Sequence, residues 1–214
     1  MKKISLISTS LLLFFLCSST LFGQQQTKEN PSFIFQMGGG LSRTFTSNAA
    51  LLPGFETKNY SNADFAFYYR AAESNLLNGI KFSMSELSSV VDPLTNAYGQ
   101  AKMMNISYAS GYVATFFKSR LLRLEAQGNV EIGYCYFHRS AKGLGKNPYA
   151  GHSTLHGMNI TIGIDTNAWF GDLMMGIGLQ LGSNTFFSRL NPGQPDKGTS
   201  IATFVPNIKF GVRF

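Results

Sequence analysis

Histidine is the residue type in this sequence with the clearest capacity for metal or acid–base chemistry. The 214-residue chain contains three, His138, His152 and His156, which lie close together in the sequence. Three imidazoles can bind Zn²⁺, because a catalytic zinc site commonly takes three protein ligands. We find no metal-binding motif in which a carboxylate or a cysteine joins them. We therefore interpret the histidines as exposed polar residues around a long connection, and we predict no metal and no other cofactor.

The same segment carries an enzymatic alternative. His152-Ser153 and His156-Gly157-Met158-Asn159 come near the His-x-Ser-Asn stretch of the lipid A deacylases, small barrel enzymes to which this part of the chain bears a partial resemblance. That resemblance implies a site on the lipid-facing surface, but the serine is absent from its place. Gly38-Gly39-Gly40 is not a nucleotide loop, because no helix follows it. We predict a protein that is not an enzyme and keep the deacylase as an alternative.

Charged residues elsewhere alternate with apolar ones, most clearly between residues 122 and 136. Leu122, Leu124, Val130 and Ile132 share one parity. The opposite parity contains the following polar side chains: Arg123, Glu125, Gln127, Asn129 and Glu131. Alternate side chains of a strand point to opposite faces, so this segment predicts a long strand with one apolar face and one charged face.

The same alternation recurs along the chain in about eight segments. They span residues 32–42, 64–70, 80–85, 104–115, 122–136, 158–165, 173–182 and 204–214. Short predicted connections (73–78, 118–121, 169–171) alternate with longer ones (46–62, 91–100, 138–153, 191–200). Long strands joined in this way are typical of transmembrane barrels, in which short periplasmic turns alternate with longer outer loops. The predicted fold is all-β, a closed antiparallel up-and-down transmembrane barrel.

The composition favours a membrane protein over a soluble one. Charged residues make up only 14% of the chain and aromatic residues another 14%, whereas about 25% of an ordinary globular domain is charged. The net charge is +7, but no run of lysine and arginine marks a nucleic-acid surface, so we predict no nucleic-acid partner. After residue 23 no apolar stretch approaches the ~20 residues of a membrane helix, which leaves strands as the spanning elements.

The N-terminal residues have the pattern of a secretory signal peptide. Lys2 and Lys3 precede an apolar run at residues 11–16, and small residues lead up to Gly23. We predict a cleaved signal peptide at residues 1–23, a short lead-in at 24–31 and a barrel at 32–214. A lipoprotein acylated at Cys17 is the alternative, but Leu16 stands where that pattern has a small residue.

The last seven residues, Ile208-Lys209-Phe210-Gly211-Val212-Arg213-Phe214, resemble the C-terminal signal of outer-membrane β-barrel proteins. The resemblance implies that Phe210, Val212 and Phe214 are recognised by the barrel insertion machinery, and that the protein lies in the bacterial outer membrane. With the signal peptide and about eight strands, the whole chain resembles the small OmpA/OmpX-type barrels. Pro206 departs from an ideal last strand, because proline cannot donate to a strand ladder.

A barrel in lipid places its charged face inside. A barrel of ~8 strands has an interior that side chains just fill, and charges there need partners. We predict a plugged polar interior with a structural network of Arg70, Lys81, Arg123, Glu125 and Glu131. The predicted function is a non-enzymatic role in membrane structure or in surface contacts of the outer loops, whose partner the sequence does not indicate. A narrow channel and a secreted, soluble, lipocalin-like barrel with its apolar face inward remain alternatives.

Overall fold

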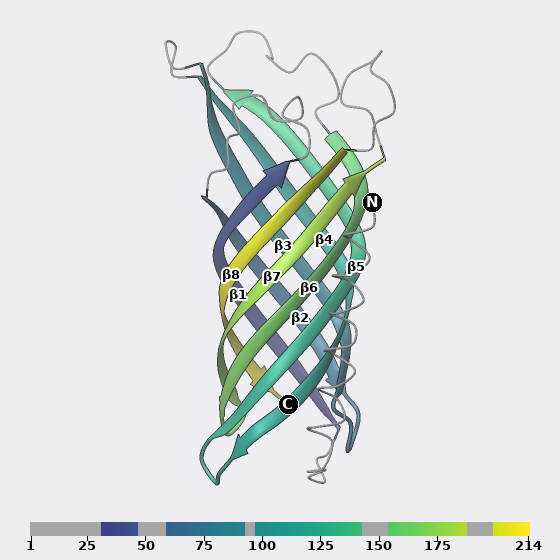
Figure 1. Ribbon diagram of the computed structural model, residues 1–214, viewed down its shortest axis with the longest axis vertical. Helices are drawn as coiled ribbons and strands as arrows, with labels where there is room; N and C mark the ends of the chain where they lie inside the picture. The colour runs from purple at the N-terminus through teal and green to yellow at the C-terminus, as the bar shows by residue number, and fades with distance from the viewer. Residues whose placement is uncertain (1–30, 47–58, 93–96, 143–153, 188–198) are drawn as a thin grey trace, which may run out of the picture.

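The computed structural model describes residues 31–46, 59–92, 97–142, 154–187 and 199–214. Within these ranges the chain forms eight strands, and each is antiparallel to its neighbours (Figure 1). They are β1 (Ser32–Thr46), β2 (Asn59–Arg70), β3 (Leu76–Asp92), β4 (Ala97–Lys118), β5 (Arg123–Lys142), β6 (Thr154–Phe170), β7 (Leu173–Phe186) and β8 (Thr199–Arg213). Sequential strands pair, and β8 pairs with β1, so the sheet closes. The predicted up-and-down barrel is confirmed.

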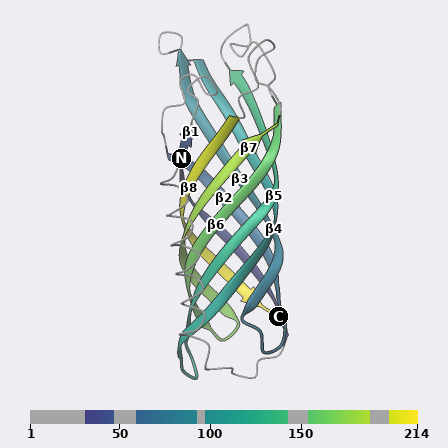
Figure 2. The same ribbon diagram turned by 45° about the vertical axis from the view of Figure 1, so that its right-hand side comes forward.

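The two ends of the barrel differ. The connections at residues 71–75, 119–122 and 171–172 lie at one end, together with the start of β1 and the C-terminus (Figures 1 and 2). We call this the short-turn end. The connections at the opposite end, residues 47–58, 93–96, 143–153 and 188–198, lie outside the described residues, as does the predicted signal peptide at 1–23.

The strands contain 12 to 22 residues, so each is long enough for the ~9–11 residues that a tilted membrane strand needs. Several extend beyond their predicted limits. The connection predicted at 91–100 shrinks to 93–96, because β3 and β4 remain paired as far as Asp92 and Ala97. Among the described residues, no helix is long and apolar enough to cross a membrane.

Large apolar side chains cover the outside of the barrel on all eight described strands. Ile164 is 61% exposed, Ile177 66% and Phe67 58%, although they lie in the middle of regular sheet. An apolar surface of this extent is unfavourable in water and favourable against hydrocarbon. A soluble lipocalin-like barrel requires the opposite orientation, so that alternative is wrong. The predicted orientation, with apolar side chains outward, is confirmed.

The tightest hairpin shows how local sequence closes the short-turn end. Phe170 pairs with Leu173, which leaves only Gly171 and Asp172 in the turn. Gly171 has a φ of 63°, a backbone angle that glycine adopts with little steric strain because it has no Cβ. A glycine at the first of two turn positions matches the hairpin turns whose twist fits that of the strands.

The lipid-facing surface can be tested with Ile164→Lys. A lysine on the lipid face near the bilayer midplane costs about 2–4 kcal/mol of folding free energy, and only about 0–1 kcal/mol near the interface. Leu173→Lys is the matched control, because Leu173 is as exposed as Ile164 but lies at the first residue of β7. Denaturant unfolding in phospholipid vesicles, followed by the fluorescence of the single tryptophan, measures both costs. Equal costs for the two variants would contradict a membrane-spanning barrel.

Candidate functional site

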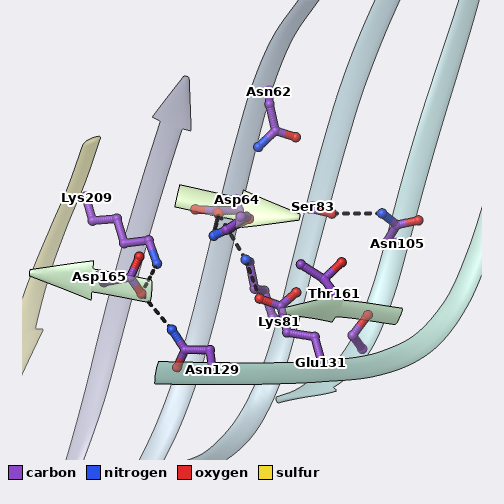
Figure 3. Close-up of polar contacts among 12 residues, drawn as sticks. Asn62, Asp64, Lys81, Ser83, Asn105, Asn129, Glu131, Thr161, Asp165 and Lys209 are labelled. Carbon is purple, nitrogen blue, oxygen red and sulfur yellow. Dashed lines mark hydrogen bonds and ion pairs between the residues drawn. The ribbon is translucent and has the colours of Figure 1, made fainter. Parts of the chain in front are cut away.

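The interior of the barrel holds the polar residues that the chain buries, and the first group of them lies near mid-height. Lys81 on β3 places its Nζ 2.7 Å from Glu131 Oε1 and 3.2 Å from Asp64 Oδ2 (Figure 3). Asp64 also accepts a hydrogen bond from Gln180 Nε2 at 3.4 Å. Each of the three charged side chains is no more than 6% exposed. A buried charge is tolerated only when it is paired and hydrogen-bonded, and these are.

A second ion pair lies beside the first. Lys209 Nζ on β8 is 2.6 Å from Asp165 Oδ2 on β6, and Asn129 Nδ2 donates to the same oxygen at 2.6 Å (Figure 3). Together with Asp64, Lys81 and Glu131, these two charged residues form what we call the central cluster. It contains two lysines and three carboxylates, so amide donors such as Asn129 supply hydrogen bonds that the lysines do not.

Two interior glycines make room for these carboxylates. A Cβ added at Gly178 would collide with Oδ1 of Asp165, and one added at Gly38 would collide with Oδ1 of Asp64. Glycine is the residue that permits so close an approach of another side chain to the backbone. These two glycines therefore serve the packing of the central cluster.

The end cluster, a separate group, occupies the interior near the short-turn end. It consists of Arg70, Arg123, Glu125, Trp169 and Arg213. Glu125 Oε1 lies 3.1 Å from Arg123 Nε and 3.5 Å from Arg70 Nη1, while Trp169 Nε1 donates to Oε2 at 2.6 Å. The guanidinium carbons of Arg213 and Arg123 lie 4.2 Å and 5.7 Å from the centre of the Trp169 ring, within cation–π range.

The five residues predicted as one network thus fall into two groups. Arg70, Arg123 and Glu125 come together in the end cluster, whereas Lys81 and Glu131 belong to the central cluster. Trp169 is the member that the sequence analysis missed, because it was assigned to a connection. Trp169 lies four residues after Asp165 on β6, so the two side chains share one face of the strand. That shared parity is the signal that places Trp169 inside.

The interior is also less polar than predicted. An apolar cluster that includes Trp169 of the end cluster lies inside the barrel, and a further set of buried apolar side chains lies nearer the outer end. The first comprises Ile34, Ala66, Tyr68, Leu77, Ala109, Val113, Trp169 and Met174, and the second includes Met103, Cys135, Phe137, Leu155, Phe186 and Ile201. Tyr68, an aromatic residue near a strand end, is 3% exposed and faces inward with Ala66 and Arg70.

The two histidines that the structure describes lie on strands, whereas the sequence analysis interpreted them as residues around a connection. His138 is on β5 and His156 on β6, and both face the outside of the barrel, where Nδ1 of His156 contacts the hydroxyl of Tyr134. Cys135 points inward, so it cannot share a metal ion with them. His152 and Ser153 lie outside the described residues. Among the residues that the structure describes, no group of three metal-ligating side chains is present.

The C-terminal residues complete the barrel. Phe214 N donates to Phe33 O at 2.9 Å, and Phe33 N donates to Phe214 O at 3.2 Å. Arg213 N donates to Asp172 O at 2.9 Å, so the end of β8 is held on both sides. Phe210 and Phe214 are exposed on the outer face, and Val212 is half-buried.

Removing one partner of an interior ion pair should lower the free energy of unfolding more than removing both partners. Lys209→Met leaves Asp165 buried without its cation, and such a loss costs about 3–5 kcal/mol. The double variant Lys209→Met/Asp165→Asn removes the uncompensated charge, so we expect it to recover most of that free energy. Equilibrium unfolding of the two variants and the parent in detergent micelles gives both values. A single variant as stable as the parent would show that the pair is not buried.

Comparison with known proteins agrees with this architecture. No protein-family model and no curated protein matches the sequence. Among solved structures, the Neisserial surface protein A (NspA) is 12% identical with a TM-score of 0.51, over 87% of this chain and 100% of that chain. Ail of Yersinia pestis, in complex with the heparin analogue sucrose octasulfate, is 10% identical with a TM-score of 0.49, over 87% and 100%. The outer membrane protein OprG from Pseudomonas aeruginosa is 10% identical with a TM-score of 0.39, over 88% and 98%.

At these identities, the likeness to NspA is one of fold. The fold supplies the closed antiparallel sheet, and the chain's own side chains supply the apolar outer face and the charged interior. Taken together, the closure, this orientation of side chains and the likeness to NspA give the chain the fold of the small eight-stranded outer-membrane β-barrels.

Proposed function

We propose that this protein works as a non-conducting, non-enzymatic barrel, which acts through membrane structure or through contacts made at its outer end. The filled interior supports the proposal more than any other observation. Charged, amide and apolar side chains follow one another along the axis, and most are less than one-tenth exposed. A barrel of ~8 strands has no room for both these side chains and a continuous water column.

The burial of both charged groups argues against the rival, a narrow channel. Lys81 pairs with both Glu131 and Asp64 at short range, and an ion passing through would have to break these contacts. The apolar cluster around Leu77 and Met174 adds a second barrier, because an ion gains no hydration there.

The insertion signal at the C-terminus is the second part of the proposal. Phe210, Val212 and Phe214 alternate with interior residues on the last strand, and Phe214 is 76% exposed beside β1. Recognition by the barrel insertion machinery fits an exposed aromatic residue at the free end of a strand. Outer-membrane lipid is the other partner, and the apolar outer face supports it.

Conductance measurements test the filled interior. We expect the purified protein in planar bilayers to give no discrete current steps, in the same bilayers in which an established porin conducts. Stepwise openings that change in size in a Lys81→Gln variant would contradict the proposal, because they would place the ion path through the central cluster.

Lipid analysis tests the deacylase alternative. The mass spectrum of lipid A from cells with and without the gene should be the same, since His156 contacts the hydroxyl of Tyr134 and the sequence lacks the serine of the His-x-Ser-Asn pattern at its place after His156. A lipid A species that loses an acyl chain only when the gene is present would make the protein an enzyme.

If the last residues are an insertion signal, a substitution of Phe214 should impair assembly into the membrane without lowering the stability of the folded protein. Phe214→Ser should lower the amount of folded protein in the outer membrane several-fold, while the purified variant refolds in micelles as the parent does. Phe170→Ser is the matched control, because Phe170 is also an exposed aromatic residue at the short-turn end. Equal membrane levels of the two variants would remove the special role of the last residue.

A further inference from the structure

Three polar side chains form a hydrogen-bonded group on the outer face of β3 and β4, which we call the outer polar cluster. Asn78 lies on β3, and Tyr108 and Ser110 lie on β4, where Ser110 pairs with Asn78 in the sheet. Other parts of the outer face differ. The outward positions of β7 within residues 173–181 and of β8 within residues 204–212 all carry apolar side chains.

Asn78 accepts both hydrogen bonds of the outer polar cluster. Tyr108 Oη donates to Asn78 Oδ1 at 2.7 Å, and Ser110 Oγ donates to the same oxygen at 3.1 Å. Asn78 is exposed, and Tyr108 is 58% exposed. Within the described residues Asn78 Nδ2 has no acceptor, so its two N–H groups face outward without a partner. Each hydroxyl oxygen also keeps lone pairs that can accept a hydrogen bond.

The outer polar cluster lies inside the apolar belt and not at its edge. Tyr108 pairs in the sheet with Ile80, the residue before Lys81. Ser110 pairs with the residue before Glu131. Lys81 and Glu131 contact each other near mid-height in the barrel interior, so the outer polar cluster lies close to that height on the outside. Hydrocarbon offers no acceptor to an amide, so N–H groups exposed there are costly unless another polar group covers them.

The chemistry of the outer polar cluster matches a second copy of itself. Apolar packing does not favour a protein neighbour over lipid, because lipid chains are as apolar as leucine, whereas hydrogen bonds between side chains do favour association. The cluster has unused donors at Asn78 and unused acceptor lone pairs at Tyr108 and Ser110, and it carries no charge that would repel a copy. A two-fold axis along the membrane normal joins the same patch on both subunits, so the donors of each copy meet the acceptors of the other.

We propose that two copies of this chain associate in the membrane through the outer faces of β3 and β4, with the outer polar cluster at the centre of the contact. Asn78 Nδ2 of each copy donates to a hydroxyl oxygen, Tyr108 Oη or Ser110 Oγ, of the other copy. Ile80 and Ile106, which are 52% and 50% exposed, flank the cluster and pack against the other copy. The contact concerns the outer face alone, so it stands whether or not the filled interior conducts ions.

Dilution in lipid tests the association. Two batches of the mature protein, labelled at their N-termini with a donor or an acceptor dye, are reconstituted together in phosphatidylcholine vesicles at decreasing protein-to-lipid ratios. Energy transfer then gives the fraction of dimer. We expect Asn78→Leu to raise the apparent dissociation constant at least tenfold. Thr166→Leu is the matched control, because Thr166 is also an exposed polar residue on the outer face but lies on β6, and it should leave the constant unchanged. Heat-modifiability on gels shows that each variant is folded.

Cross-linking locates the contact. In a Cys135→Ser background, Ile80→Cys places a single thiol beside the outer polar cluster, and a short bifunctional thiol reagent should link two copies there. Ile177→Cys is the control, because Ile177 is 66% exposed on the outer face of β7, and its thiols should remain unlinked.

Three results would each overturn the proposal: a parent that stays monomeric at every protein-to-lipid ratio, equal dissociation constants for Asn78→Leu and the parent, or linking at position 177 and not at position 80. A monomeric parent that retains a phospholipid in native mass spectrometry, where Asn78→Leu loses it, would assign the outer polar cluster to lipid instead.

Discussion

Hydrocarbon cannot form hydrogen bonds with the polypeptide backbone, and this constraint determines the rest of the structure. Each unsatisfied N–H or C=O group in the bilayer would cost several kcal/mol, so a sheet in lipid has to close on itself. Closure depends here on the pairing of β1 with β8, from Ile34 with Arg213 to Thr46 with Ile201. Once the sheet is closed, each strand has one face toward lipid and one toward a narrow interior.

The interior then has to be filled, and the chain fills it in layers. The end cluster and the apolar cluster, which share Trp169, lie near the short-turn end, the central cluster lies near mid-height, and a second apolar set lies nearer the outer end. Glycines such as Gly38 and Gly178 give the carboxylates the space they need. Because side chains fill the interior, we propose that its charges stay paired with one another and that the barrel does not conduct ions.

Alternation predicted which face of each strand meets lipid, because that property repeats every second residue and depends on no other strand. It succeeded along β5, where Glu125 and Glu131 face inward and Ile132 faces outward. It is less informative where both faces of a strand are apolar: Tyr68 is aromatic but faces inward, with the same parity as Arg70. An aromatic residue near a strand end suits an outer girdle and an inner plug equally well, so composition alone could not decide.

The partners of the interior charges were beyond the sequence for a different reason. Lys81 meets Asp64 and Glu131 because of the register and stagger of β2, β3 and β5, and these depend on the closed barrel. Local pattern carries no information on stagger, so the five predicted network residues could not be divided into two clusters. The role of Trp169 was missed likewise, because its partners Glu125 and Arg213 come from two other strands.

In a barrel that spans the membrane, the apolar outer face meets lipid while Trp169 stays inside. Quenching of tryptophan fluorescence by phospholipids brominated in their acyl chains measures this directly. In vesicles of such lipids, the native Trp169 should be quenched weakly. A tryptophan introduced by Ile177→Trp in a Trp169→Phe background should be quenched strongly, since position 177 is 66% exposed on the outer face. Strong quenching of Trp169 together with none at position 177 would contradict the account.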